Sequence, residues 1–158
     1  LSGGMVAIDR AGRVLRMATM PAMVGVAEID SRRVIEWIRS VIGMERAVCG
    51  IEVCPQHANQ ASVMRSMGIS HGILIGSIHA ACRAVRIVRV VSGTKPKASW
   101  QRRLFGYVSV SGQTKTLAAA MARRIWPDQD WIPHGCRTPN TGLIDAALIA
   151  HFVRTENL

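Results

Sequence analysis

The spacing of apolar and polar positions predicts strands in the first two thirds of the chain. Two apolar runs, Met5–Ile8 and Val14–Met20, flank a short turn that ends at Gly12, which is typical of a β-hairpin. A third run, Arg46–Val53, is apolar on both faces, as expected of a central strand covered on both sides. Val85–Val91 predicts a fourth strand.

Apolar residues at helical spacing predict the helices between and after these strands. The first helix is capped by Asp30 or Ser31 and ends at Gly43, and a long helix covers Asn59–Cys82. Three further helical segments follow, at Ser99–Phe105, Thr114–Trp126 and Gly142–Arg154. The order β-β-α-β-α-β-α-α-α indicates an α/β domain with a mixed sheet.

The long helix carries glycines at intervals of four, at Gly68, Gly72 and Gly76. Each glycine inside a helix costs about 1 kcal/mol relative to alanine, so a row of them needs a reason. A flat strip of this kind lets another helix approach closely. Internal packing and a homodimer interface are both open explanations.

The charge of the chain indicates its partners. Lys and Arg number 20 against ten acids, which gives a formal charge of +10 and favours phosphate backbones or an anionic membrane surface. The longest apolar stretch, Ile69–Cys82, is too short and too polar to span a bilayer. The four cysteines have no paired spacing, so we expect reduced thiols and a cytoplasmic location.

Two acidic residues occupy positions where apolar residues are expected. Glu52 is near the carboxyl end of the predicted central strand, and the carboxyl ends of strands are where α/β sheets gather their sites. Asp145 shares one helical stripe with Leu148, Ile149 and Phe152. For Glu52, the alternative without a catalytic role is a strand-end glutamate that emerges into water. For Asp145, it is an aspartate in the first turn of a helix, whose charge complements the helix dipole.

Two inward carboxylates repel each other and lose solvation unless a cation lies between them. Together with the basic charge, they suggest a divalent-metal site that acts on a phosphodiester. Mg²⁺ suits ligands that are all oxygen, and we expect Mn²⁺ to substitute for it. Glu52 and Asp145 are therefore the predicted catalytic and metal-binding residues.

The order of the segments resembles that of the RuvC-like Holliday-junction resolvases, which have the ribonuclease-H-like fold. The similar segments are, in chain order, LSGGMVAIDRAGRV after the family's first strand, EIDSRRVIEWIR as its first helix, GIEVCPQ as the strand with its second acid, MRSMGISHGILIGSIHAA as its dimerisation helix, KPKASWQRRLFG as its basic segment, and TGLIDAALIA as its closing helix. The resemblance implies a mixed sheet flanked by helices, with residues 1–158 as a single nuclease domain that lacks its first strand.

The resemblance also implies an Asp-Pro-Gly motif just before Leu1, whose aspartate would be a metal ligand. Asp9 lies at the far end of the first hairpin strand, so we interpret it as a turn residue and not as a replacement. Of four implied acidic positions, the chain shows two. Asn140 or Thr141 could hold a metal-bound water at the position of one missing acid. Gln101 follows Trp100, where the resemblance implies a lysine.

The expected activity is that of a structure-selective endodeoxyribonuclease, a homodimer that resolves four-way junctions by metal-dependent hydrolysis, and that is impaired without the first aspartate. Trp100 is expected in the core and not as a platform for bases. The expected DNA-binding residues are Lys95, Lys97, Arg102, Arg103, Lys115 and Arg65. A catalytically inactive branched-DNA-binding relative and a ribonuclease-H-like RNA nuclease are the alternatives.

Overall fold

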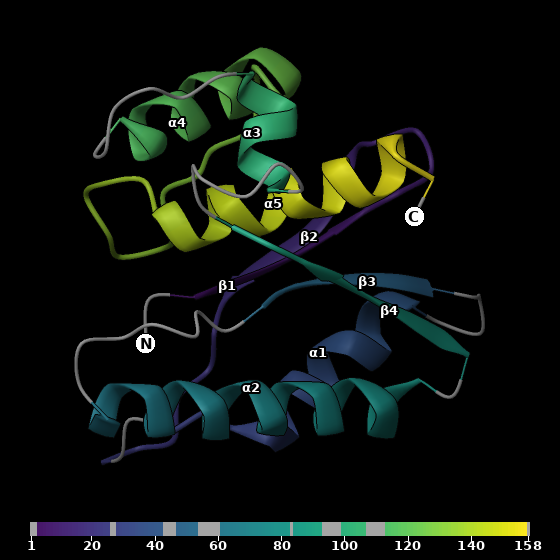
Figure 1. Ribbon diagram of the computed structural model, residues 1–158, viewed down its shortest axis with the longest axis vertical. Coiled ribbons are helices and arrows are strands. Elements are labelled where there is room, and N and C mark those ends of the chain that lie inside the picture. The colour runs from purple at the N-terminus through teal and green to yellow at the C-terminus, as the bar shows by residue number, and fades with distance from the viewer. Residues whose placement is uncertain are drawn as a thin grey trace.

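The computed structural model describes residues 3–25, 28–42, 47–53, 61–82, 84–92, 99–106 and 113–157 (Figure 1). The described elements follow the predicted order. The strands are β1 (Gly4–Ile8), β2 (Val14–Thr19), β3 (Ala47–Glu52) and β4 (Val85–Val90), and the helices are α1 (Ser31–Ile42), α2 (Ala61–Ala81), α3 (Trp100–Phe105), α4 (Thr114–Ile125) and α5 (Thr141–Thr155). The predicted cap of α1 is confirmed, because Asp30 Oδ1 accepts a hydrogen bond from Arg33 N at 3.1 Å. Gly43 and Asn59 lie outside the described residues.

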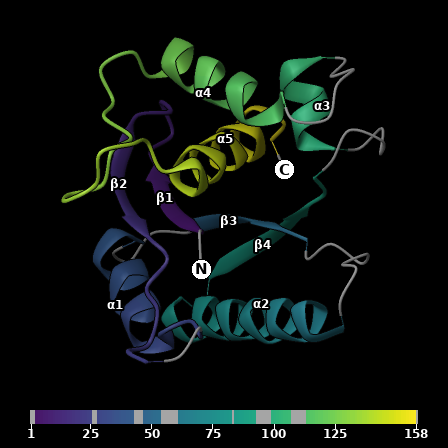
Figure 2. The ribbon, with the colours of Figure 1, turned by 90° about the vertical axis from the view of Figure 1, so that its left-hand side faces the viewer.

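The elements form three layers, with the strands between two groups of helices (Figure 2). Helices α3, α4 and α5 cover one side, where Trp100, Leu143 and Leu148 are almost completely buried. Helices α1 and α2 cover the other side around Val34 and Ile78. This is the α/β architecture expected from the sequence.

The strands form two pairs. β1 and β2 are antiparallel, with Gly4 opposite Thr19, and β3 and β4 are parallel, with Glu52 opposite Val90. Among the described residues, no backbone ladder joins β1 to β3. The predicted mixed sheet is therefore present as one antiparallel and one parallel pair.

The close contacts of both strand pairs with helix α5 show in which direction each pair runs along this helix. A Cβ atom on Gly4, at the start of β1, would lie 2.6 Å from the Gly142 backbone at the start of α5, whereas Gly12, after the end of β1, lies against Arg154. A Cβ on Gly50 would lie 2.7 Å from the side chain of Ile149. Since Glu52, two residues later, interacts with Asp145, β3 runs back along α5 and is antiparallel to β1.

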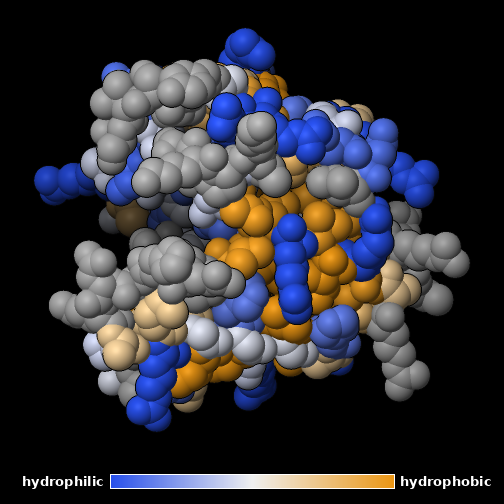
Figure 3. All heavy atoms as spheres, in the orientation of Figure 1, coloured by the Kyte–Doolittle hydropathy of each residue, from blue (hydrophilic) through white to orange (hydrophobic). Residues whose placement is uncertain are grey.

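The glycine strip of α2 faces outward. A Cβ built at Gly68, Gly72 or Gly76 finds no atom within 4 Å in the part of the chain that the structure describes. The expectation of internal packing is therefore wrong for these residues. The face of the molecule crossed by α2 shows a pale band of small residues (Figure 3), and Val63, Met67 and Ile69 nearby are exposed.

Within the described residues, no helix combines the length and apolar character needed to cross a membrane.

Candidate functional site

Glu52 is the last residue of β3, and it is exposed, so the alternative of a strand-end glutamate that emerges into water is correct as to its burial. Its carboxylate accepts a hydrogen bond from a buried tryptophan. The Trp100 indole Nε1–H donates to Glu52 Oε1 at 3.3 Å. Trp100 itself is 0% exposed, and its backbone N–H donates to Val91 O at 3.0 Å, which fixes the start of α3 beside β4. The prediction that Trp100 belongs to the core is confirmed, but its role in orienting Glu52 was missed. The signal was the indole N–H, because a buried tryptophan generally finds a hydrogen-bond acceptor.

Asp145 lies on the face of α5 that packs on the strands. Leu148, Ile149 and Phe152, which share its stripe, are all buried, as their spacing predicts. The helix begins at Thr141 and has no acidic residue in its first turn, so Asp145 lies in the second turn. Stabilisation of a helix end by charge falls off within the first turn. The alternative of a first-turn aspartate placed for the dipole is therefore wrong.

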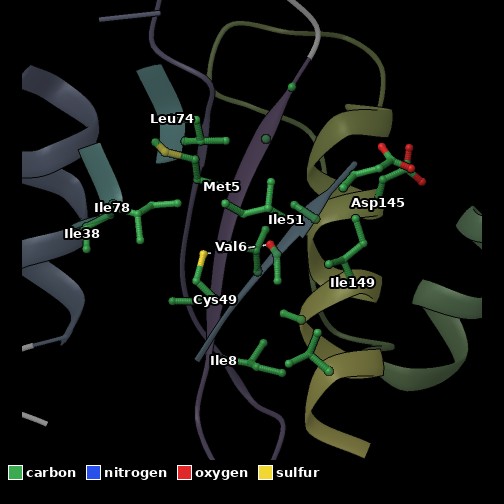
Figure 4. Close-up of a pocket in the computed structure, with 18 of the residues that line it drawn as sticks. Met5, Val6, Ile8, Ile38, Cys49, Ile51, Leu74, Ile78, Asp145 and Ile149 are labelled. Atoms are coloured by element: carbon green, nitrogen blue, oxygen red, sulfur yellow. Dashed lines mark hydrogen bonds between the residues drawn. The ribbon is translucent and has the colours of Figure 1, made fainter. Parts of the chain in front are cut away.

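The structure brings Glu52 and Asp145 together. Burial and, after it, the negative charge of Glu52 raise the pKa of Asp145 to about 6, while the positive charge of Lys115 acts in the opposite direction. An interaction of this kind requires that the two carboxylates and the ammonium group share one site. Figure 4 shows Asp145 at one end of the cavity, away from Met5, Ile38 and Ile78. The site is thus two carboxylates with one neighbouring cation.

The side chains that could replace a missing acid lie in different surroundings. Asn140 Oδ1 accepts from Leu143 N at 3.1 Å and caps α5, so this oxygen is already used. Thr141 lines the same cavity as Asp145 and Lys115. Asp9 lies beyond the far end of β1, where its carboxylate accepts from Arg13 N and Nε at 2.9 and 2.7 Å. The interpretation of Asp9 as a turn residue is confirmed.

The basic residues named from the sequence are dispersed in the structure. Lys115 is exposed in the first turn of α4 and lines the cavity beside Asp145, and Arg65 is exposed on α2. Arg103 pairs with Glu156, and its guanidinium lies 5.4 Å from the centre of the Phe152 ring. Arg102 belongs to the first turn of α3. Lys95 and Lys97 lie outside the described residues.

The described residues hold no group of three or more His, Cys, Asp or Glu side chains that could bind a metal ion. Glu52 and Asp145 therefore provide two carboxylates toward such a site. Carboxylate oxygens suit a hard cation such as Mg²⁺, so the chemistry of the donors fits and their number is small.

Comparison with known proteins identifies the fold. No protein-family model and no curated protein sequence matches the chain. Among solved structures it is similar to Thermus thermophilus RuvC in complex with a Holliday-junction substrate, with a TM-score of 0.59 and 17% identity over 94% of this chain and 82% of that chain. It is also similar to a second structure of Thermus thermophilus RuvC, with a TM-score of 0.56 and 16% identity over 98% of this chain and 88% of that chain. The protein therefore has a RuvC-like, ribonuclease-H-like fold, as the order of its sequence segments predicts.

Proposed function

We propose that this chain is the nuclease domain of a metal-dependent endodeoxyribonuclease that resolves Holliday junctions. The observation that carries the proposal is the convergence of Glu52 and Asp145 beside Lys115, within a fold similar to that of a protein bound to a Holliday junction. A mutually repelling pair of carboxylates on a chain of charge +10 is more consistent with a cation site facing DNA than with a structural role.

Glu52 and Asp145 are the residues that would hold Mg²⁺, with Mn²⁺ as a substitute. The ion would supply stabilisation of negative charge on the phosphodiester and activation of a water. Trp100 limits the rotation of the Glu52 carboxylate through its indole N–H. Lys115 offsets part of the repulsion between the two acids and would contact a phosphate bound at this site.

The DNA-binding role extends to the other basic residues named from the sequence, Lys95, Lys97, Arg102, Arg103 and Arg65. For Arg103, binding a phosphate would mean giving up its ion pair with Glu156.

Among the described cysteines, Cys49, Cys82 and Cys136 are free thiols, which supports a reducing, cytoplasmic compartment.

The proposed enzyme is a homodimer through the strip Gly68, Gly72 and Gly76. The strip is open to close approach, and exposed apolar side chains lie beside it. We expect Gly72→Leu to make the chain monomeric in sedimentation velocity, because the larger side chain separates the two helices. Gly72→Ala adds only a methyl group and should reduce dimer formation far less. A dimer that is unchanged in Gly72→Leu would rule out this interface.

Cleavage of synthetic junctions tests the proposed activity. The protein, expressed together with any codons upstream of Leu1, is incubated with four-way junctions or linear duplex in Mg²⁺. We expect symmetric nicking of the junction, reduced roughly 100-fold or more in Glu52→Gln because one charged group of the site is lost. Glu36→Gln is the matched control, since Glu36 is exposed on α1 and pairs only locally with Arg32. Equal cleavage by Glu52→Gln and the unaltered protein would contradict the proposal.

One observation favours a second function, that of an inactive protein that binds branched DNA. The described residues contribute only two carboxylates to the site. Tight binding of the junction without nicking would support this function, and faster cleavage of RNA–DNA hybrids would support a ribonuclease instead.

A further inference from the structure

Strand β4 has one edge that faces away from β3. Val53 N donates to Val90 O at 2.8 Å, so the even-numbered residues of β4 direct their N–H and C=O groups toward β3. Because the residues of a strand alternate between its two edges, Val85, Ile87 and Arg89 direct theirs outward. We call the backbone groups of these three residues the outer edge of β4. In the described part of the chain, no backbone group of another segment pairs with them.

The chain itself uses the position that follows this edge. Val91 comes directly after β4, and its C=O accepts a hydrogen bond from Trp100 N at 3.0 Å. Val91 and Ser99 thereby form a parallel bridge. The side of β4 that lies away from β3 therefore accepts a hydrogen bond in strand geometry, and the outer edge continues this side toward the start of the strand.

The side chains beside the outer edge are apolar on both faces of the strand. Val85 and Ile87 are half-buried and pack on the side of α1 and α2, and Val88 packs on the side of α5. Val48, the neighbour of Arg86 on β3, is 48% exposed. Figure 3 shows apolar surface across the middle of the face that β4 crosses in Figure 1. A second strand laid along the outer edge would cover apolar side chains as well as pair the backbone.

Two arginines interrupt this apolar strand, three positions apart. Arg86 and Arg89 are the exposed residues of the sequence VRIVRV. Successive side chains of a strand point to opposite faces, so one arginine lies on each face. A neighbouring strand meets both only if it carries an acid on each of its own faces, which requires acids at positions i and i+3. The order apolar–Arg–apolar–apolar–Arg–apolar is the same in both directions, so a parallel and an antiparallel neighbour need the same spacing.

The two charges also decide which kind of partner fits. Pairing of β4 with a second copy of itself would collect four arginines in one short ladder, and like charges across strands are destabilising. Exposed charges are a common device that keeps edge strands from pairing with their own kind. An acidic strand instead gains an opposite-charge pair on each face. DNA phosphates would meet the arginines but would leave the apolar side chains uncovered.

We propose that the outer edge of β4 is a docking site for a partner protein, which adds one extended strand with acids at positions i and i+3 and apolar residues around them. The backbone of this strand pairs with the outer edge, and its acids lie beside Arg86 and Arg89. The docking site uses neither Glu52 nor Asp145, so it is independent of DNA cleavage.

Two peptides of equal composition test the docking site on the 158-residue chain. The probe is Val-Glu-Val-Ile-Glu-Val, a usual strand length, with a glycine–serine pair at each end. In the control peptide the central residues are reordered as Val-Glu-Val-Glu-Ile-Val, which puts both acids on one face. We expect the probe at saturation to slow amide exchange of Val85, Ile87 and Arg89 about tenfold or more, read by NMR on labelled protein. The control peptide should bind about fivefold more weakly, since it pairs with one arginine at a time.

Charge reversal in the protein supplies the matched variants. The double variant Arg86→Glu, Arg89→Glu should bind the acidic probe about tenfold more weakly, and should prefer a probe with lysine in place of glutamate. The control is Arg123→Glu, Arg124→Glu, an equal change of charge at exposed positions on α4, which should keep the preference of the unaltered protein. A reversed preference cannot arise from loss of folding, because an unfolded variant would bind neither probe selectively.

Four results would overturn the docking site. Equal binding of the probe and its reordered control would mean that charge alone attracts the peptide. Protection of the outer edge that increases with protein concentration without peptide would mean that a second copy occupies it. Weaker binding of four-way junctions by the β4 double variant, but not by the α4 double variant, would assign the arginines to DNA instead. No protection of the outer edge by the probe in large excess would exclude strand addition.

Discussion

Gly4→Ala is expected to lower the free energy of unfolding by about 3 kcal/mol, the upper part of the range for overpacked sites. The added Cβ would lie 2.6 Å from the carbonyl of Gly142 and from Leu143 N, which are backbone atoms at the start of α5. A side chain could rotate away, but this backbone can move only with the helix. For a chain of this length the melting temperature should fall by roughly 6–12 °C, which thermal unfolding followed by circular dichroism would measure.

Gly3→Ala is the matched control for that experiment. Its Cβ would meet the side chain of Met20 at 3.3 Å, which a small adjustment relieves. We expect a loss of about 1 kcal/mol or less at this position. Equal losses at Gly3 and Gly4 would show that the close approach of β1 to α5 does not limit stability.

Asp145→Asn is expected to stabilise the metal-free protein at neutral pH. The pKa of Asp145 is raised to about 6, chiefly by burial and then by Glu52, so the ionised form is disfavoured in the folded state. Stability of the unaltered protein therefore falls as the pH rises from the unfolded pKa near 4 to the folded pKa near 6, and is constant above it. After allowance for solvent screening, the gain from asparagine should be about 2 kcal/mol at pH 8 and close to zero near pH 4.

Urea unfolding across this pH range measures the difference, and Asp9→Asn supplies a control of opposite sign. The pKa of Asp9 is lowered by hydrogen bonds from the backbone and side chain of Arg13, so its charge stabilises the turn above its unfolded pKa. Millimolar Mg²⁺ should reduce the difference in the free energy of unfolding between Asp145→Asn and the unaltered protein, because an ion at the two carboxylates stabilises only the ionised site. A gain in stability that does not depend on pH would contradict the raised pKa of Asp145.

Local sequence patterns were enough to predict the elements and to single out the two acids. Periodicity predicted the hairpin, the buried stripe after Asp145 and the alternation that turns Glu52 toward α5, because each depends on residues close in sequence. The fold class followed from the order of these elements and is confirmed by the similarity to RuvC structures.

Contacts between residues that are far apart in the sequence could not be predicted from it. The division of the strands into two separate pairs depends on which strand edges meet, and the relation of β1 to β3 involves residues about 40 positions apart with no pattern of their own. The hydrogen bond from Trp100 to Glu52 joins segments separated by 48 positions. Glycine spacing in α2 was visible, but whether the strip faced inward or outward depended on where the whole helix packs.

The contact between Trp100 and Glu52 gives the protein an intrinsic optical probe. An indole responds to the electric field along its ring, and this ring donates directly to a carboxylate of the site, whereas Trp126 donates to Gly12 O at 2.7 Å instead. Of the four tryptophans, Trp100 is the one that donates directly to Glu52, so neutralising the charge on Glu52 changes the electric field at this indole ring. Ultraviolet fluorescence of the unlabelled protein can therefore follow a ligand arriving at the carboxylates, with the emission of Trp100 as the signal.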